Sequence, residues 1–368
     1  MKVRLGDVCD KASSSIIQKS LEGHEGKYPI YGASGLIKYV DFYQREKPYI
    51  AVVKDGAGIG RVMKLPAYSS VIGTMQYIIP NEKVDINYLV YSMEYMNLAK
   101  YFSGATIPHI YFRDYQKEPL NLPEIKVQKK IGGILSNIEK LIAFRNQELS
   151  KFDQLVKSRF IELFGDPVSN DKFWNLAILQ DVTSKIGSGA TPKGGKSSYQ
   201  KEGIPFIRSM NVHDGVFLSK DLAYLSDKQA KQLENVIVKE NDVLLNITGA
   251  SVARSCIVPK TVIPARVNQH VSIIRCIPKY LNPEFLNKLF LHHRYKNLLL
   301  SLGEAGGATR QAITKSQLEK LQIILPPLTL QNEFADFVQQ VDKSKLAVQK
   351  SLEKLEILKK SLMQQYFG

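Results

Sequence analysis

Two tracts of the chain carry the hydrophobic spacing of long amphipathic helices. Apolar residues recur at steps of three and four from Val127 to Leu163, and again from Phe334 to Leu362. Such steps place apolar side chains along one seam of a helix, as in helices that pack together over their whole length. Each tract covers roughly 38 residues, which is about 57 Å of helix at 1.5 Å per residue. The pattern therefore predicts two long helices.

The two tracts belong to one repeated unit. A Gly-Ala-Thr tripeptide stands at 104–106 and again at 307–309, and Phe-Gly stands at 164–165 and again at 367–368, so both ends keep an offset of 203 residues. No insertion interrupts the register, which indicates a duplication. The favoured arrangement is an antiparallel pair within the chain, and the alternative is two helices that pack separately on other domains. Further matches inside the unit are Leu122-Pro123 with Leu325-Pro326 and Gln128 with Gln331.

The segments before the two helical tracts have the pattern of mixed sheet domains. In the first segment, short β-branched runs predict strands at 48–53, 61–63 and 76–79, and a helix is predicted at 87–102. In the second segment, the same order predicts strands at 242–247 and 271–274 and a helix at 282–301. The loop at 55–61 matches 248–254 at its first glycine (Gly56 and Gly249) and at its arginine (Arg61 and Arg254).

We therefore expect an α+β protein. Two mixed α/β domains are separated by two long antiparallel helices, which form an intramolecular coiled coil with a pseudo-two-fold internal repeat. The expected boundaries are 1–122 for the first globular domain, 123–166 for the first helix, 167–325 for the second globular domain and 326–368 for the second helix.

The net charge of the chain indicates what kind of partner it binds. A formal net charge of +15 favours a polyanionic partner, most often nucleic acid. The three cysteines (Cys9, Cys256 and Cys276) have no CxxC spacing, which is typical of a reducing cytosol and predicts no metal site. No apolar run is long enough to span a bilayer. We expect a cytoplasmic protein without a membrane partner.

Catalytic motifs are incomplete in this sequence. Gly195-Lys196-Ser197 resembles the end of a phosphate-binding loop, but Gly189 stands one residue too early. The glycines at 56, 58 and 60 lack the last glycine of a dinucleotide fingerprint, and His292-His293 has no third spaced ligand. The motif of an adenine methyltransferase is also missing, because the only Pro-Pro lies in 325–328 without the required flanks. The sequence predicts a chain that is not an enzyme by itself and binds no cofactor.

Residue types that contact nucleic acid are well represented near the predicted strand ends. Short polar side chains can bind phosphates, while Arg, Asn and Gln can read base edges through two hydrogen bonds. In the first domain the candidates are Tyr31, Ser34, Lys54, Arg61, Thr74, Gln76, His109 and Arg113. In the second domain they are Thr191, Lys193, Lys196, Tyr199, Arg208, Asn211, Arg254, Asn268, Gln269, His270 and Arg310.

Several motifs, in this order and partly duplicated, resemble the specificity (S) subunit of a type I restriction–modification system over essentially the whole chain. The second half carries the clearest ones, at 187–195, 203–208, 242–251, 267–271, 306–310 and 325–331. The first half carries a second style of recognition domain, with Tyr-Pro-Ile-Tyr-Gly-Ala-Ser-Gly at 28–35 and Asp-Gly-Ala at 55–57.

The resemblance implies that each globular part is a target-recognition domain that reads one half of a bipartite, asymmetric site in double-stranded DNA. The helices would be conserved spacers that fix the gap and dock two methyltransferase (modification) subunits. S-adenosylmethionine would be bound by those partners, and ATP and Mg by motor-nuclease (restriction) subunits. Two alternatives remain at this point: the recognition subunit of a type IIB restriction system, and a non-catalytic coiled-coil interaction protein.

Overall fold

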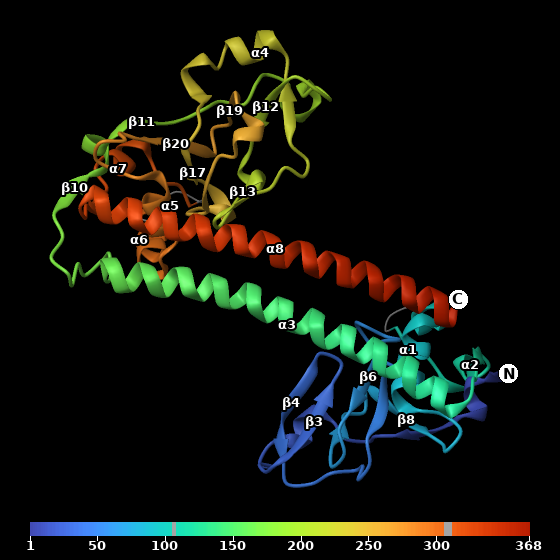
Figure 1. Ribbon diagram of the computed structural model, residues 1–368. Coiled ribbons are helices and arrows are strands. Elements are labelled where there is room, and N and C mark those ends of the chain that lie inside the picture. Colours follow the sequence, from blue (N-terminus) through green and yellow to red (C-terminus); the bar gives the residue numbers. More distant parts are fainter. Residues whose placement is uncertain (105–107, 305–310) are drawn as a thin grey trace. The chain divides into compact units, whose positions relative to one another are not determined.

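The computed structural model describes residues 1–104, 108–304 and 311–368 (Figure 1). Contacts divide the chain into two compact units. Unit 1 consists of Met1–Glu148 and Val348–Gly368, and unit 2 consists of Leu149–Ala347. Each of the two long helices contains 40 residues and contributes to both units. These helices are α3 (Ile125–Phe164) and α8 (Leu328–Phe367).

Unit 1 contains two main sheets, with strand orders β2-β8-β5-β6 and β4-β3-β7. Strand β3 pairs antiparallel with β4 and parallel with β7, and β1 pairs antiparallel with β9. The bounds are β1 (Lys2–Arg4), β2 (Cys9–Ser13), β3 (Tyr28–Gly32), β4 (Gly35–Val40), β5 (Tyr49–Val53), β6 (Val62–Leu65), β7 (Ser70–Val71), β8 (Met75–Pro80), β9 (Pro119–Asn121), α1 (Ile86–Tyr95) and α2 (Phe112–Tyr115).

Strand β5 is buried along its whole length because it supplies two cores. Successive side chains of a strand point to opposite faces of the sheet. Ile50 and Val52 accordingly pack in the core that includes α1, whereas Ala51 and Val53 pack in the core on the other face. This double burial explains why the strand is an uninterrupted apolar run in the sequence.

Unit 2 contains two four-stranded sheets, with strand orders β11-β20-β17-β18 and β15-β12-β19-β16. Strand β12 pairs antiparallel with β15 and parallel with β19, and β10 pairs antiparallel with β21. The bounds are β10 (Leu176–Ile178), β11 (Thr183–Ser188), β12 (Ile204–Ile207), β13 (Val212–His213), β14 (Val216–Phe217), β15 (Ala223–Leu225), β16 (Ile237–Val238), β17 (Val243–Asn246), β18 (Ser255–Ile257), β19 (Ala265–Val267), β20 (Val271–Cys276), β21 (Gln322–Ile324), α4 (Asp227–Lys231), α5 (Pro283–Leu291), α6 (His293–Glu304) and α7 (Lys315–Glu319).

Both helices that precede the repeat are shorter than the sequence predicts. The helix predicted at 87–102 is α1, which ends at Tyr95 because Asn97 adopts a left-handed φ of 50°. The helix predicted at 282–301 is split into α5 and α6, because His292 takes an extended backbone and its ring stacks on Phe160 at 5.8 Å. The prediction of one helix that contains both His292 and His293 is therefore wrong.

Helices α3 and α8 contact each other within each unit. In unit 1, Ile131 and Leu135 share a core with Met363, and Glu139 accepts a hydrogen bond from Lys359. In unit 2, Lys345 pairs with Asp153 at 2.7 Å and Arg159 with Glu333 at 2.9 Å. Figure 1 shows the ribbons of the two helices that carry these residues, α3 in green and α8 in red. The residue with the higher number on α3, Arg159, pairs with the residue with the lower number on α8, Glu333. The contacting segments in unit 2 therefore run antiparallel.

Most residues of the predicted seam are buried or half-buried, but a few are exposed. In unit 1, α3 packs on the globular domain as well as on α8, and the buried side chains there are Gln128, Ile131, Leu135 and Ile138. Three predicted seam residues consequently face solvent: Val127, Leu141 and Leu358. None of the described helices is both long enough and apolar enough to cross a membrane.

Candidate nucleic-acid interface

An arginine follows the same kind of turn in both units. In unit 1, the turn from β5 to β6 is closed by the Val53 amide, which donates to the Arg61 carbonyl at 3.0 Å. In unit 2, the turn from β17 to β18 is closed by the Asn246 amide, which donates to the Arg254 carbonyl at 2.8 Å. The matched hydrogen bonds place Arg61 and Arg254 at equivalent positions of the two turns.

A second set of hydrogen bonds ties each turn to the first part of the repeated unit, which precedes the long helix. The Gly56 amide donates to the Pro108 carbonyl, and the Gly249 amide donates to the Gln311 carbonyl, both at 2.9 Å. Glycine suits these two positions because φ is +81° and +72°, a region that other residues rarely adopt. The acceptors at 108 and 311 keep the offset of 203 residues found in the sequence.

The predicted residues of unit 1 differ in their exposure. Gln76 is buried, and its amide oxygen accepts a hydrogen bond from Tyr115 Oη at 3.1 Å, so it is a core group and not a reader of bases. Burial also raises the pKa of the half-buried Tyr31, which keeps its hydroxyl protonated and able to donate. Those at the surface are Ser34, Arg61, Thr74 and Arg113, and those half-buried are Tyr31, Lys54 and His109.

Three of these residues line one cleft. Ser34, Arg61 and Thr74 surround a cavity of about 500 Å³, to which Gln18 and Asp55 also contribute. Sequence reasoning missed Gln18 and Asp55 as site residues. Gln18 lies in a polar stretch without a motif, so that only its neighbours in space reveal it.

Asp55, which lines this cleft, has two polar neighbours. His109 Nδ1 donates to the Asp55 carboxylate, which also lies 3.6 Å from the ammonium of Lys54. A carboxylate only accepts hydrogen bonds, so this contact leaves the Nε2 atom of His109 for other partners. Arg113 lies over the ring of Tyr111, with 4.6 Å from its guanidinium carbon to the ring centroid.

The predicted residues of unit 2 divide in the same way. Thr191, Lys193, Lys196 and Gln269 are exposed, and those half-buried are Tyr199, Arg208, Arg254 and His270. Arg310 lies outside the described residues. The two predicted asparagines are buried, and both serve the backbone, so the structure does not place them as base readers. Asn211 donates to Leu218 O at 2.9 Å and accepts from Arg208 N at 3.0 Å, and Asn268 accepts from His270 N at 3.0 Å.

Several of the other predicted residues of unit 2 hold one another in place. Thr191 donates to the side chain of Gln269, and Thr248 lies 2.5 Å from the Nδ1 atom of His270. The guanidinium of Arg208 lies 5.6 Å from the ring centroid of Tyr199. The first two contacts join the segment after β11 and the turn after β17 to the loop before β20.

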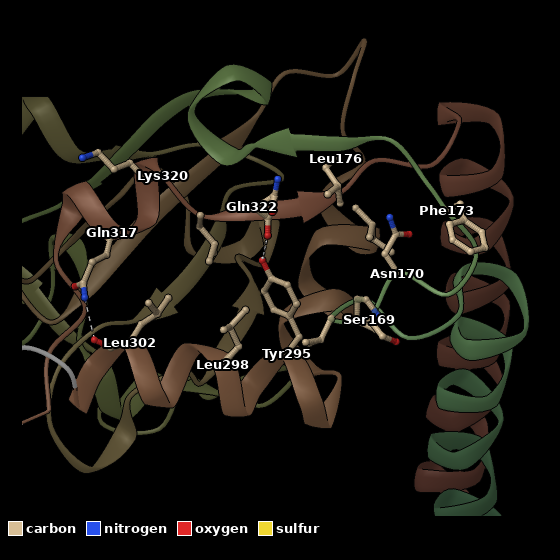
Figure 2. Close-up of a pocket in the computed structure, with 14 residues that line it drawn as sticks. Ser169, Asn170, Phe173, Leu176, Tyr295, Leu298, Leu302, Gln317, Lys320 and Gln322 are labelled. Carbon is tan, nitrogen blue, oxygen red and sulfur yellow. Dashed lines mark hydrogen bonds between the residues drawn. The ribbon is translucent and has the colours of Figure 1, made fainter.

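Another pocket lies in unit 2, away from these residues. It has a volume of about 690 Å³, and its described lining contains none of the residues predicted for nucleic acid. Figure 2 shows that apolar side chains of α6, among them Leu298 and Leu302, form one wall, and that Tyr295 donates from its hydroxyl to the carbonyl of Gln322 at 2.7 Å. The described residues also contain no cluster of three potential metal ligands.

Comparison with known proteins assigns the chain to a family. The family described as "Type I restriction modification DNA specificity domain" matches residues 1–152 and 172–358. The chain belongs to this family. Its members supply the DNA sequence specificity of type I restriction–modification systems and are not the catalytic subunits.

Individual specificity subunits resemble the chain over nearly its whole length. The type I restriction enzyme MjaVIII specificity subunit of Methanocaldococcus jannaschii is 23% identical, over 98% of this chain and 90% of that protein. The crystal structure of the S subunit from M. genitalium has a TM-score of 0.70 at 14% identity and covers 100% of this chain and 96% of that one. A structure from work on assembly and conformational transition of the type I R-M system has a TM-score of 0.56 at 18% identity, covering 100% and 97%.

Proposed function

We propose that the two globular parts are target-recognition domains that arose by duplication, and that each reads one half of a bipartite, asymmetric site in double-stranded DNA. Shared topology supports this: each domain has a strand paired antiparallel with one neighbour and parallel with the other (β3 and β12), and each has the arginine-bearing turn. Their loops differ in sequence, as two different half-sites require.

We further propose that the helices set the gap between the half-sites. Both contain 40 residues, which corresponds to about 60 Å at 1.5 Å per residue. A ruler also needs a firm joint between each helix and its recognition domain. The proposed domain limits are 1–122, 123–166, 167–325 and 326–368, with the two helices paired as an antiparallel coiled coil.

The joint is the observation that carries the proposal. Near the start of α3, the side chain of Gln128 is buried; its Oε1 accepts from Asp85 N at 2.8 Å, and its Nε2 donates to the carbonyls of Lys83 and Pro123. Asp85 caps α1 with its side chain, so the amide ties the spacer helix to the recognition domain.

The same joint occurs near the start of α8. Gln331 Oε1 accepts from Asn282 N at 2.9 Å, and its Nε2 donates to the carbonyls of Tyr280 and Pro326 at 3.1 and 2.8 Å. Asn282 is the cap of α5, as Asp85 is the cap of α1. Two buried glutamines with the same three hydrogen bonds indicate that the geometry of each joint matters.

In the complex we propose, two methyltransferase subunits dock on the helix pair and flip an adenine for methylation from S-adenosylmethionine. Motor-nuclease subunits that bind ATP and Mg complete the restriction activity, and this chain binds no cofactor itself. We propose that the predicted residues that are not buried contact DNA. Among them, the exposed Lys193 and Lys196 would bind phosphates. We place the complex in the cytoplasm.

Purification with the companion methyltransferase, followed by sequencing of adenine methylation on genomic DNA, tests the proposal. We expect a two-part motif with a fixed, unspecified gap. Replacement of residues 1–122 by the corresponding part of a relative should change one half of the motif and leave the other half and the gap unchanged. A continuous motif, or a change in both halves, would refute the model of two readers on one ruler.

A further inference from the structure

Four loops of unit 1 converge on the cleft that holds Arg61. Gln18 comes from a short 3₁₀ helix (Gln18–Leu21), Ser34 from the turn between β3 and β4, Arg61 from the turn between β5 and β6, and Thr74 from the turn between β7 and β8. The cavity between them has a volume of about 500 Å³. All four side chains are exposed, so they are open to a partner from solvent.

Backbone hydrogen bonds hold these loops in place. The Gly73 amide donates to the Ile16 carbonyl at 2.7 Å, which joins the loop of Gln18 to the turn before β8. The Lys54 amide donates to the Thr74 carbonyl at 3.0 Å, which joins that turn to the loop of Arg61. The cleft is therefore formed before a partner binds, and binding need not order its loops.

Two side chains in the cleft have the chemistry that reads purines. The Nη1 atom of Arg61 donates to the Ala33 carbonyl at 2.7 Å, which orients the guanidinium and leaves its other N–H groups for a partner. Within the described residues, no hydrogen bond engages the side-chain amide of Gln18. In the major groove, arginine binds guanine at O6 and N7, and glutamine binds adenine at N6 and N7, each through two hydrogen bonds.

The other groups that line the cleft suit a DNA edge. Asp55 is the carboxylate among them, and the ammonium of Lys54 lies 3.6 Å from it, so its charge is partly offset where a polyanion would approach. Ile37 and Ile72 form an apolar part of the lining. An apolar surface of this kind can contact the methyl group of thymine.

We infer that Gln18 and Arg61 determine the specificity of the first recognition domain, with Gln18 reading an adenine and Arg61 reading a guanine in its half-site. This inference rests on the proposed function, because it assumes that unit 1 reads one half of a bipartite site. Gln18 was not among the residues predicted from the sequence. Arg61 was, and the inference now assigns it a guanine.

Substitutions in the full-length chain, purified with its methyltransferase, test the inference. The methylated motif is sequenced, and binding is measured by competition between duplexes that differ at one base. Glutamate accepts from the amino group of cytosine, so Gln18→Glu should replace adenine by cytosine at one position of the first half. Lysine lacks the planar two-donor fork of the guanidinium, so Arg61→Lys should reduce the preference for guanine by about fivefold or more at another position. The second half of the motif should not change in either variant.

Matched variants outside the cleft control for general effects. Gln180→Glu changes an exposed glutamine of unit 2 outside the proposed contacts, and Arg4→Lys changes an exposed arginine before the first 3₁₀ turn; both should keep the complete motif. A bipartite wild-type motif that stays unchanged in Gln18→Glu and Arg61→Lys would overturn the inference and leave the proposed function standing. A wild-type complex without a bipartite motif would overturn both.

Discussion

The buried glutamine at the start of each spacer helix gives the most direct test of how the molecule is held together. Gln331→Leu keeps roughly the volume of the side chain but removes both hydrogen-bonding groups. The amide of Asn282 then loses its acceptor, and the carbonyls of Tyr280 and Pro326 lose their donor. Because Gln331 is buried, water does not replace these partners.

The size of the effect follows from these three groups. A buried N–H left unpaired costs about 1–3 kcal/mol, and two carbonyls that lose one of their partners together add about 1 kcal/mol. We therefore expect Gln331→Leu to lower the free energy of unfolding of unit 2 by about 2–4 kcal/mol. In a unit of this size that corresponds to a fall in Tm of roughly 5–15 °C. Gln128→Leu should cost a similar amount in unit 1.

The assay is thermal and urea unfolding of the full chain, with hydrogen exchange to identify the affected unit. Gln331→Leu should reduce amide protection in residues 149–347, and Gln128→Leu in residues 1–148 and 348–368. Gln349→Leu is the matched control, because this glutamine is exposed and its contact with Glu353 is long at 3.5 Å. A surface change of this kind stays within about 0.5 kcal/mol.

A charged variant adds a pH test. Gln331→Glu keeps an acceptor for Asn282 but points a carboxylate at two carbonyl oxygens, so the pKa of this glutamate should be raised in the folded state above about 4.3. The folded protein then holds a proton that the unfolded chain releases. Stability should fall as pH rises from about 4.3 towards the folded pKa, by up to about 1.4 kcal/mol per pH unit. Leucine variants within 0.5 kcal/mol of wild type, or a pH profile for Gln331→Glu like that of wild type, would refute the reasoning.

Three further predictions concern packing and reactivity. Gly60→Ala would place a Cβ atom 2.4 Å from the amide nitrogen of Ala99 at a φ of +78°, so we expect a loss of more than about 2 kcal/mol in thermal unfolding. Ala253, with a φ of +65° in the matching turn, should tolerate glycine within about 1 kcal/mol, and equal effects at the two positions would contradict this account. Asp242→Ala should cost about 3 kcal/mol in urea unfolding, because it leaves Arg275 without the carboxylate that it binds through two hydrogen bonds of 2.7 and 2.8 Å; a loss below 1 kcal/mol would show that water replaces the pair. Burial raises the pKa of each cysteine thiol to about 12, so a thiol reagent at pH 8 should label none of the three in the folded chain and all of them in denaturant. Mass spectrometry measures the labelling, and rapid labelling of any of the three in the native protein would contradict this prediction. These thiols belong to Cys9, Cys256 and Cys276.

Strands and spacer helices could be predicted from sequence because each has a long, regular signal. The apolar run at 48–53 contains β5, which is buried on both faces, and the steps of three and four found α3 and α8. The ends of α1 and α5 were missed. Each depends on the backbone of one residue, Asn97 or His292, and tertiary packing decides that conformation.

The candidate interface was predictable only in part. The shared turn indicated the positions of Arg61 and Arg254, because glycines mark where the backbone must turn. Gln76, Asn211 and Asn268 have side chains that suit base edges, but they are buried and hydrogen-bonded inside the domains. Composition alone cannot tell an amide that serves the backbone from one that faces DNA. Gln18 was missed for the opposite reason, since only the approach of distant loops gives it a site.

The division of the chain also sets an order for folding during synthesis. Residues 149–347 form unit 2 without help from either end, whereas unit 1 needs residues 348–368. Met363 lies in the core of unit 1, and the ring of Phe367 lies 5.2 Å from that of Tyr88. On the ribosome, residues 1–148 therefore wait for residues 348–368, and unit 2 can complete its core before unit 1 does.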